Sequence, residues 1–310
     1  MKKKIIAVIS ILFSLIIISL LLLHGLSIYL IASATEQFKN TSLFTDRNEV
    51  LIDGHTISYR EYNQNGDDVL VFVHGFMGSS YDFHLLNQEL LNLNPSLRII
   101  AVDLLGFGFS SKPDDFNYAR ENQAIIVREL LKQLDIDTYH LAGHSMGGEV
   151  VIRHTHLYPN NVKSLILISS AGLETRPQND PLPTWFYSCI FKNYFAQRYG
   201  FNSASHVRLS NDLYHPFIIQ NSQIPSTTLQ QFALASDTTS IIEYLPEITI
   251  AVLIVYGDSD SWTPVAFGTQ LHDLLENSEL TILENIGHLP FLEDPNLLAK
   301  VIFDFLANDE

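Results

Sequence analysis

The 310-residue chain is 46% hydrophobic and contains one cysteine, Cys189. Its length suits one large α/β domain with an appendage, and the single cysteine excludes both an intramolecular disulfide and a cysteine metal cluster. The formal net charge is −16. Residues 1–34 contain three lysines and no acid, so the rest of the chain carries 15 basic against 34 acidic residues. A domain this acidic should repel nucleic acid and anionic lipid headgroups, which excludes binding to either through a basic face.

The N-terminal segment, residues 1–34, is predicted to anchor the chain in a membrane as a single helix. Its lysines precede an almost unbroken apolar run from Ile5 to Ala32, which exceeds the roughly 20 residues that span a bilayer. A cleaved signal peptide is the alternative, because Ala-Ser-Ala at 32–34 resembles a cleavage site, but such peptides have an apolar core of only about 7 to 15 residues. The basic end should stay in the cytoplasm and the acidic remainder should cross the membrane, to be secreted or periplasmic if cleavage occurs. The polar residues 35–47 are interpreted as a linker.

The rest of the chain is predicted to alternate strands with helices. The sequence from Glu49 to Asn63 alternates around Asp53-Gly54, as a β-hairpin would. Apolar runs suited to strands buried on both faces occupy 69–73, 99–102, the run from 139, 165–168, 252–256 and 280–283. Helical patterns occupy 124–134 and 149–157. This order predicts a mostly parallel sheet with helices on both faces, whose functional loops lie at the carboxyl ends of the strands.

The segment from Gly172 to Pro246 departs from this alternation, because no strand pattern recurs in it. It begins with prolines and is rich in aromatic residues, namely Trp185, Phe186, Tyr187, Phe191, Tyr194, Phe195, Tyr199 and Phe201. We interpret this insertion as a mostly helical lid over the site. Most of its rings are expected to form the core of a small subdomain, and the others to line an apolar pocket or to face the bilayer.

The residues from Gly143 to Gly147, Gly-His-Ser-Met-Gly, match the pattern G-x-S-x-G. They lie between an apolar run and a helical pattern, which is the strand, turn and helix context of a nucleophile elbow. A serine in a strained turn needs neighbours without Cβ atoms, because the strand before it and the helix after it approach closely. The Ser145 hydroxyl would be exposed beside the Met146 N–H, at a helix start that favours an anion. The pattern also fits an ordinary glycine-rich turn, so the hypothesis depends on the other motifs.

Two further loops carry the groups that a nucleophilic serine requires. A serine hydroxyl reacts well only when a base, oriented by a third group, removes its proton. Asp258 and Asp260 follow the strand that ends at Tyr256, and His288 follows the last strand. On one α/β scaffold the residues of such a triad follow each other along the chain in this same order: serine, acid and histidine.

Over roughly residues 48–308 the sequence resembles the α/β-hydrolase fold family. The motifs that carry the resemblance are an oxyanion loop, the loop after the next strand, the elbow, the acid loop and the histidine loop. In the same order, these five motifs lie at His74-Gly75-Phe76, Asp103 to Ser110, Gly143 to Gly147, Gly257 to Pro264 and Gly287 to Pro295. One departure is Leu105, where members often carry proline. The resemblance implies an eight-stranded, mostly parallel sheet in a catalytic domain at 48–310, with the lid inserted at about 172–246.

The resemblance also implies a role for each site residue. Ser145 would attack a carbonyl carbon, and His288 would take its proton and later return it to the leaving group. Asp260 would fix the imidazole tautomer. The backbone N–H groups of Phe76 and Met146 would hold the oxyanion, an interaction commonly worth about 10² to 10³ in rate for each donor. Asp258 and, more distantly, Glu174 are alternative acids.

The other polar residues of these loops are predicted to have structural roles. His74 is expected to brace the oxyanion loop, His144 to pack or hydrogen-bond at the elbow, and Asp103 to fix its loop through hydrogen bonds. The remaining histidines lack a metal-ligand spacing such as H-E-x-x-H. The chain also lacks a G-x-x-x-x-G-K loop and a complete dinucleotide fingerprint. We therefore predict neither a metal nor a cofactor.

The favoured hypothesis is a membrane-anchored serine hydrolase that cleaves a carboxylic ester through an acyl-enzyme. The anchor and the aromatic lid favour an apolar or lipid-like acyl substrate. Hydrolysis of a carbon-carbon bond, a thioester or an amide on the same triad is the alternative reaction. Serine at the elbow disfavours the dehalogenase and epoxide hydrolase branches, which resemble this fold but use a carboxylate nucleophile. A third hypothesis is a ligand-binding protein that keeps the scaffold without turnover.

Overall fold

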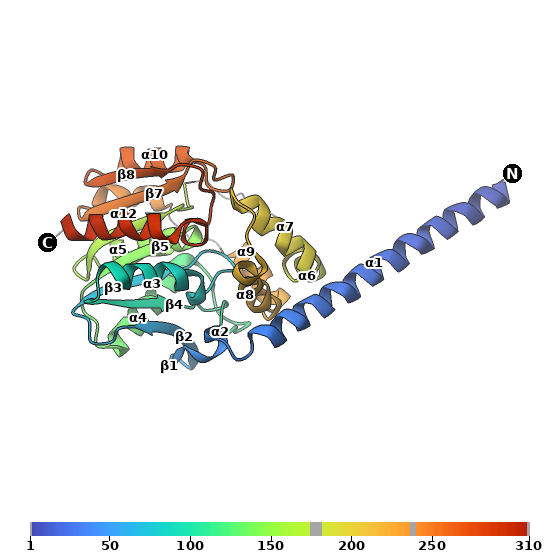
Figure 1. The fold of residues 1–310 in the computed structure, drawn as a ribbon, viewed down its shortest axis with the longest axis horizontal. Coiled ribbons are helices and arrows are strands. Elements are labelled where there is room, and N and C mark those ends of the chain that lie inside the picture. The colour runs from blue at the N-terminus through green and yellow to red at the C-terminus, as the bar shows by residue number, and fades with distance from the viewer. Residues whose placement is uncertain (1, 174–181, 236–239, 309–310) are drawn as a thin grey trace.

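The computed structural model describes residues 2–173, 182–235 and 240–308. Its centre is an eight-stranded sheet in the order β1-β2-β4-β3-β5-β6-β7-β8 (Figure 1). The strands are β1 (Asn48–Ile52), β2 (His55–Tyr62), β3 (Asp68–Val73), β4 (Leu97–Val102), β5 (Tyr139–His144), β6 (Val162–Ile168), β7 (Ala251–Gly257) and β8 (Ser278–Leu283). β2 runs antiparallel to both of its neighbours, and the other pairs are parallel. The prediction of a mostly parallel sheet is therefore confirmed.

Helices cover both faces of this sheet (Figure 1). One face packs against α3 (His84–Leu93) and α12 (Pro295–Asn308), and the other against α4 (Arg120–Gln133), α5 (Met146–Leu157) and α10 (Val265–Leu274). In β3, Leu70 and Phe72 join the first core while Val71 and Val73 join the second, because successive side chains of a strand point to opposite faces. The continuous apolar runs of the sequence thus correspond to strands buried on both sides.

The antiparallel edge of the sheet is the predicted hairpin. β1 and β2 pair from Asn48 with Tyr59 to Ile52 with His55. Asp53 and Gly54 connect the two strands, with φ values of 48° and 81°. A two-residue turn with φ positive at both positions matches the right-handed twist of the strands, and Asp-Gly suits it.

The regular elements that the structure describes between β6 and β7 are all helical. It contains α6 (Thr184–Phe191), α7 (Tyr194–Ala204), α8 (Asn211–Ser222), α9 (Ser226–Leu234) and the 3-10 turns η2 (Ile241–Glu243) and η3 (Leu245–Glu247). We call α6 to α9 the cap. Residues 174–181 and 236–239 of the predicted lid lie outside the described residues. The cap helices lie between the sheet and the N-terminal helix (Figure 1).

The N-terminal helix α1 (Lys2–Phe38) extends away from the rest of the molecule (Figure 1). Its part from Ile11 to Phe38 contains an 18-residue stretch with a mean hydropathy of 2.5 and is long and apolar enough to cross a membrane. The end of α1 contacts α7 and α8, and the Ser27 hydroxyl accepts a hydrogen bond of 2.9 Å from the Tyr194 backbone N–H. The apolar helix and the cap are therefore joined by direct contacts.

The segment predicted as a linker, residues 35–47, is attached to the domain. Its first residues continue α1, and α2 (Ser42–Thr45) follows. Leu43 is fully buried, and the Arg60 guanidinium donates hydrogen bonds to the carbonyl oxygens of Ser42 and Leu43 at 2.7 and 2.6 Å. These contacts fix the direction in which α1 leaves the domain.

The junction of β5 with α5 is a tightly packed turn at the edge of the sheet. A Cβ atom on Gly143 would lie 2.5 Å from the Gly147 carbonyl oxygen, and one on Gly147 would lie 2.3 Å from the Val73 carbonyl oxygen. Real Cβ atoms do not approach backbone so closely, so the two positions accept only glycine. Ser145, between them, has φ 52° and ψ −119°, a strained conformation for a residue with a side chain.

We expect Gly147→Ala to lower the midpoint of thermal unfolding of the detergent-solubilised full chain by several degrees. Overpacking costs about 1 to 3 kcal/mol, and each kcal/mol shifts the midpoint of a domain of this size by about 2 to 4 °C. Gly200→Ala in α7 is the matched control, because a Cβ there would meet no atom nearer than 4.0 Å and alanine favours a helix by about 1 kcal/mol. Equal midpoints in the two variants would contradict this interpretation.

Candidate active site

Ser145 lies where β5 ends and α5 begins, at the carboxyl edge of the sheet. The Ser145 backbone N–H donates to the Ile168 carbonyl oxygen at 3.0 Å, and its carbonyl oxygen accepts from the Ala171 N–H at 3.0 Å. These bonds to the neighbouring strand and the loop after it hold the strained backbone in place. Its side chain is half-buried and lines a cavity.

His288 and Asp260 form a buried pair. Their side chains come from the loops after β8 and β7, and His288 Nδ1 lies 2.8 Å from Asp260 Oδ2. The two residues are 2% and 6% exposed. Because an ionised carboxylate only accepts, His288 carries a proton on Nδ1 and donates it to Asp260. The imidazole therefore has a fixed orientation and tautomer.

Thr263 and Trp262 complete the surroundings of the Asp260 carboxylate. Oδ1 accepts from the backbone N–H groups of Trp262 and Thr263 at 2.8 and 2.9 Å, and the Thr263 hydroxyl donates to Oδ2 at 2.8 Å. Burial raises the pKa of Asp260, but the hydrogen bond and charge of His288 and the donors of Thr263 outweigh it and hold the pKa below its usual value. The carboxylate is thus kept ionised, and its stabilising effect is lost only as the pH falls through this lowered pKa.

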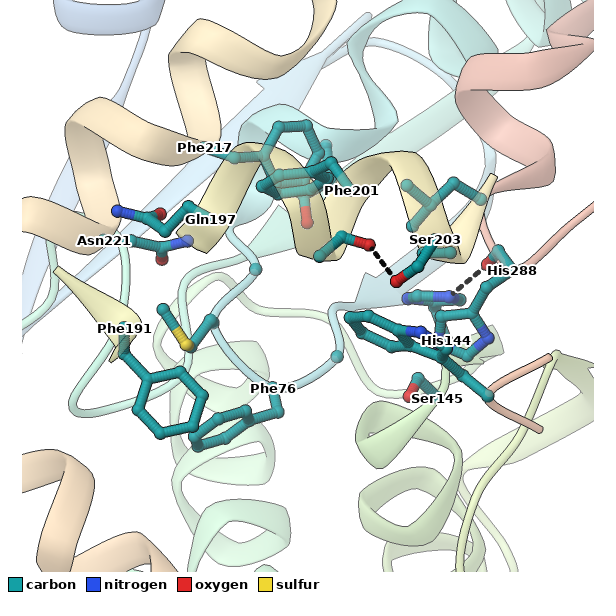
Figure 2. A pocket seen from close by; sticks show the side chains of 18 of the residues that line it. Phe76, His144, Ser145, Phe191, Gln197, Phe201, Ser203, Phe217, Asn221 and His288 are labelled. Carbon is teal, nitrogen blue, oxygen red and sulfur yellow. Dashed lines mark hydrogen bonds between the residues drawn. The ribbon is translucent and has the colours of Figure 1, made fainter. Parts of the chain in front are cut away.

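Ser145 and His288 line one wall of a cavity of about 450 Å³. Figure 2 shows both residues, with His144, on the same side of the pocket. Three loops that are far apart in the sequence therefore meet at one edge of the sheet, as the sequence predicted for residues at the carboxyl ends of parallel strands.

The predicted oxyanion residues flank Ser145. The loop that carries Phe76 passes so close that a Cβ on Gly75 would lie 3.0 Å from the Ser145 Cβ. Met146 is the first residue of α5, where backbone N–H groups have no carbonyl partner within the helix. The loop and the helix start thus bring two backbone segments to the serine from different sides.

The expected structural residues around the site make the contacts assigned to them. His74 donates from Nδ1 to the Gly75 carbonyl oxygen at 2.7 Å and accepts at Nε2 from the Leu104 N–H at 3.0 Å. Burial lowers the pKa of His74, so the ring stays neutral in this bridge. Asp103 accepts from the N–H groups of Ser80 and Phe109 at 2.6 and 2.8 Å, which fixes the adjoining loops.

His144 supports His288 through the backbone. Its Nε2–H donates to the His288 carbonyl oxygen at 2.9 Å, and burial, with the nearby charge of His288, holds the pKa of His144 well below the usual value. The sequence did not single out Thr263 or this role of His144. The only sequence feature that could have indicated Thr263 or this role of His144 is proximity, because both residues lie within three positions of a predicted triad member.

The alternative acids are placed differently from Asp260. Asp258 is exposed and accepts hydrogen bonds from the Asn285 N–H and the Ser259 hydroxyl at 2.8 and 2.9 Å. Glu174 lies outside the described residues. Asp260 is therefore the acid that contacts His288 within the described part of the chain. The same part contains no cluster of three or more His, Cys, Asp or Glu side chains that could hold a metal ion.

Aromatic and aliphatic side chains make up most of the cavity wall. Those of the cap and of the loops near it are Phe76, Met77, Ile190, Phe191, Tyr199, Phe201, Phe217, Trp262, Leu289 and Phe291. Phe76 packs edge to face against Phe107 and Phe191, with ring centroids 5.6 and 5.8 Å apart. The cap thus contributes apolar side chains to the cavity that Ser145 also lines.

Comparison with known proteins gives relatives with hydrolytic functions. The chain is 28% identical over 266 residues to the uncharacterized hydrolase YugF of Bacillus subtilis, covering 82% of this chain and 96% of that protein. It is 26% identical over 270 residues to Lipase 1 of Psychrobacter immobilis, covering 82% of each. The crystal structure of a membrane phospholipase A, described as a bacterial virulence factor, superposes with a TM-score of 0.74 at 24% identity, covering 100% of this chain and 99% of that one.

The last of these likenesses supports the fold. The sequence model of the alpha/beta hydrolase fold matches residues 68–295, which include every predicted site residue. This match covers well over half of the chain. The chain therefore belongs to the alpha/beta hydrolase fold family.

Proposed function

We propose that the protein is a membrane-anchored serine hydrolase that cleaves a carboxylic ester with an apolar acyl chain. The observation that carries the proposal is the position of Ser145. It has a strained backbone at the end of β5 and shares a cavity wall with His288, whose other ring nitrogen is hydrogen-bonded to Asp260. These observations support the proposal, because a serine hydroxyl becomes nucleophilic when a histidine oriented by a carboxylate removes its proton.

In the first half of the reaction, Ser145 Oγ attacks the ester carbonyl carbon while His288 Nε2 takes the hydroxyl proton. The negative charge that develops on the carbonyl oxygen is held by the backbone N–H groups of Phe76 and Met146. Asp260 stabilises the imidazolium that forms. The carbon-oxygen bond to the alcohol then breaks, and the leaving alcohol receives the proton from His288.

In the second half, water attacks the acyl-enzyme. His288 removes a proton from this water, the bond between the acyl carbon and Ser145 Oγ breaks, and Oγ recovers the proton. The free acid leaves and the serine is regenerated. The tautomer fixed by Asp260 serves both halves, because Nε2 must act as a base first and as an acid second.

Three observations support an apolar or lipid-like substrate. The cavity wall beside Ser145 is mostly aromatic and aliphatic. Several large apolar side chains of the cap are exposed, among them Trp185, Ile190 and Tyr199. Relatives of the chain include a lipase. An acyl chain bound in this cavity would lose its contact with water, which provides most of the affinity for such a ligand.

The proposed anchor is α1, which would place the cap beside the bilayer. Its large apolar residues from Ile11 to Tyr29 are exposed, and its end contacts α7 and α8. Lysines at the N-terminus favour retention of that end in the cytoplasm. The catalytic domain is then on the other side of the membrane.

We expect Asp260→Asn to lower kcat by about 10² to 10⁴, because an amide cannot hold the imidazole in the reactive tautomer. Asp258→Asn is the matched control, since it changes the same group in the same loop at an exposed position that does not contact His288. It should alter kcat by no more than about twofold. A large loss in the Asp258 variant with little loss in the Asp260 variant would reverse the assignment of the acid.

Fluorophosphonate labelling combined with ester hydrolysis tests the activity. Wild-type protein should be labelled at Ser145, and Ser145→Ala should neither be labelled nor hydrolyse ester. Across p-nitrophenyl esters from acetate to decanoate, kcat/KM should rise with chain length because each buried methylene adds about 0.8 kcal/mol. Thioester and amide analogues of the preferred length should react more slowly. Labelling that persists in Ser145→Ala would refute the nucleophile, and faster amide cleavage would refute the ester.

Protease accessibility tests the topology. In sealed, right-side-out membrane vesicles, protease added outside should digest the catalytic domain and leave α1 in the membrane fraction. Vesicles opened with detergent are the control for protease activity. Protection of the whole domain in the sealed vesicles would overturn the proposed orientation, and release of intact domain without protease would indicate a cleaved signal peptide.

A further inference from the structure

Two carboxamide side chains of the cap line the mostly apolar cavity, and three of their polar atoms have no hydrogen-bond partner among the described residues. Gln197 of α7 is 7% exposed and Asn221 of α8 is 2% exposed, and both belong to the cavity wall. Gln197 Oε1 and Nε2 and Asn221 Oδ1 have no hydrogen-bond partner among the described residues. In Figure 2 the two amides lie together, across the pocket from Ser145 and His288.

Such groups are uncommon in a native interior. Most buried polar atoms are hydrogen-bonded, and a buried donor or acceptor left without a partner destabilises the fold by about 1 to 3 kcal/mol. Both oxygen and nitrogen of Gln197 are unpaired, so exchanging the two atoms of the amide would not supply a partner. The two side chains face a cavity, where a bound molecule can provide the missing hydrogen bonds.

The chemistry of the wall restricts what that molecule can present. Two unpaired oxygen acceptors require a donor, which an ester or ketone oxygen cannot be. No lysine or arginine is among the described residues that line the cavity, so a carboxylate or phosphate would have no counter-charge there. A hydroxyl both donates and accepts without charge, and it therefore fits the pair.

Asp82 is consistent with an uncharged ligand group. It is the one carboxyl among the described residues that line the cavity, and it accepts a hydrogen bond from the Ser79 hydroxyl at 2.9 Å. Burial raises its pKa well above the usual value, which favours the neutral acid. A ligand cation would thus find no fixed negative charge on this wall.

We infer that Gln197 and Asn221 form a polar subsite that binds a hydroxyl group of the substrate, remote from the ester that reacts. The inference rests on the proposed ester hydrolysis at Ser145 and narrows its substrate class to hydroxyl-bearing apolar esters. The hydroxyl can belong to the acyl chain, as in a hydroxy fatty acyl ester, or to the alcohol, as in a monoacylglycerol. In both cases the subsite fixes how far the apolar chain enters the cavity.

The test compares matched esters with the full-length enzyme in detergent. For the acyl arm, p-nitrophenyl 8-hydroxyoctanoate is compared with p-nitrophenyl octanoate. For the alcohol arm, monooctanoylglycerol is compared with propyl octanoate. The measured quantity is the ratio of kcat/KM between hydroxylated and plain ester in each pair, so a variant that is partly unfolded still gives an interpretable value.

Wild-type enzyme should prefer the hydroxylated ester in one arm, and that arm identifies the source of the hydroxyl. Gln197→Leu and Asn221→Leu, which keep most of the side-chain volume, should each reduce this ratio by about fivefold to tenfold, the net effect of one hydrogen bond. Gln220→Leu is the matched control, because Gln220 is also buried on α8 with an unpaired oxygen but does not line the cavity. It should leave the ratio unchanged.

Two outcomes would overturn the inference while leaving the proposed function intact. In the first, the wild type hydrolyses plain esters but the Gln197→Leu and Asn221→Leu variants do not change the ratio in either arm, which is the result expected if only an ordered water occupies the subsite. Alternatively, Gln220→Leu changes the ratio as much as the other two variants. Absence of hydrolysis of every ester by the wild type would instead refute the proposed function itself.

Discussion

The close approach of three backbone segments around Ser145 is the constraint on which the candidate site depends. Carbonyl oxygens of β3 and of α5 occupy the space that side chains at Gly143 and Gly147 would need, so the turn between β5 and α5 has no room to relax. Its strain is carried by Ser145, with φ 52°, and is compensated by the buried sheet on either side. A serine in this position projects from the edge of the sheet and cannot be moved without disturbing the core.

The sheet also determines which loops can reach that serine. Parallel strands deliver their following loops to one edge, and the order β3-β5-β6-β7-β8 brings the loops of Phe76, Asp260 and His288 to the edge where Ser145 lies. Within this group the His288 and Asp260 pair is buried, and its hydrogen bond gains strength from the low local dielectric. The neutral His74 and His144 support the pair and the neighbouring loop from behind. Buried hydrogen bonds therefore hold the pair and the loop beside it in place.

The cap combines apolar and polar side chains on its two sides. Its inner side is mostly apolar, but it includes the buried amides of Gln197 and Asn221, which have unpaired atoms. Its outer side carries exposed apolar residues and contacts α1. Because α1 is docked through Ser27 and the segment around Leu43, the cap and the apolar helix hold a defined position relative to each other. The cap helices α7 and α8 thus both line the cavity and contact the apolar helix.

The sequence by itself determined the strands, the hairpin at Asp53-Gly54, the helical character of the cap and the pattern of glycines around Ser145, because periodicity and steric exclusion are local properties that a few residues encode. It also placed His288 after the last strand. Only the tertiary structure decided between Asp258 and Asp260, since two acids two residues apart differ in which one is buried against the imidazole. It alone attached the segment 35–47 to the domain and brought Gln197 and Asn221 to one cavity. Such pairings depend on contacts between distant segments, for which no residue pattern along the chain gives a signal.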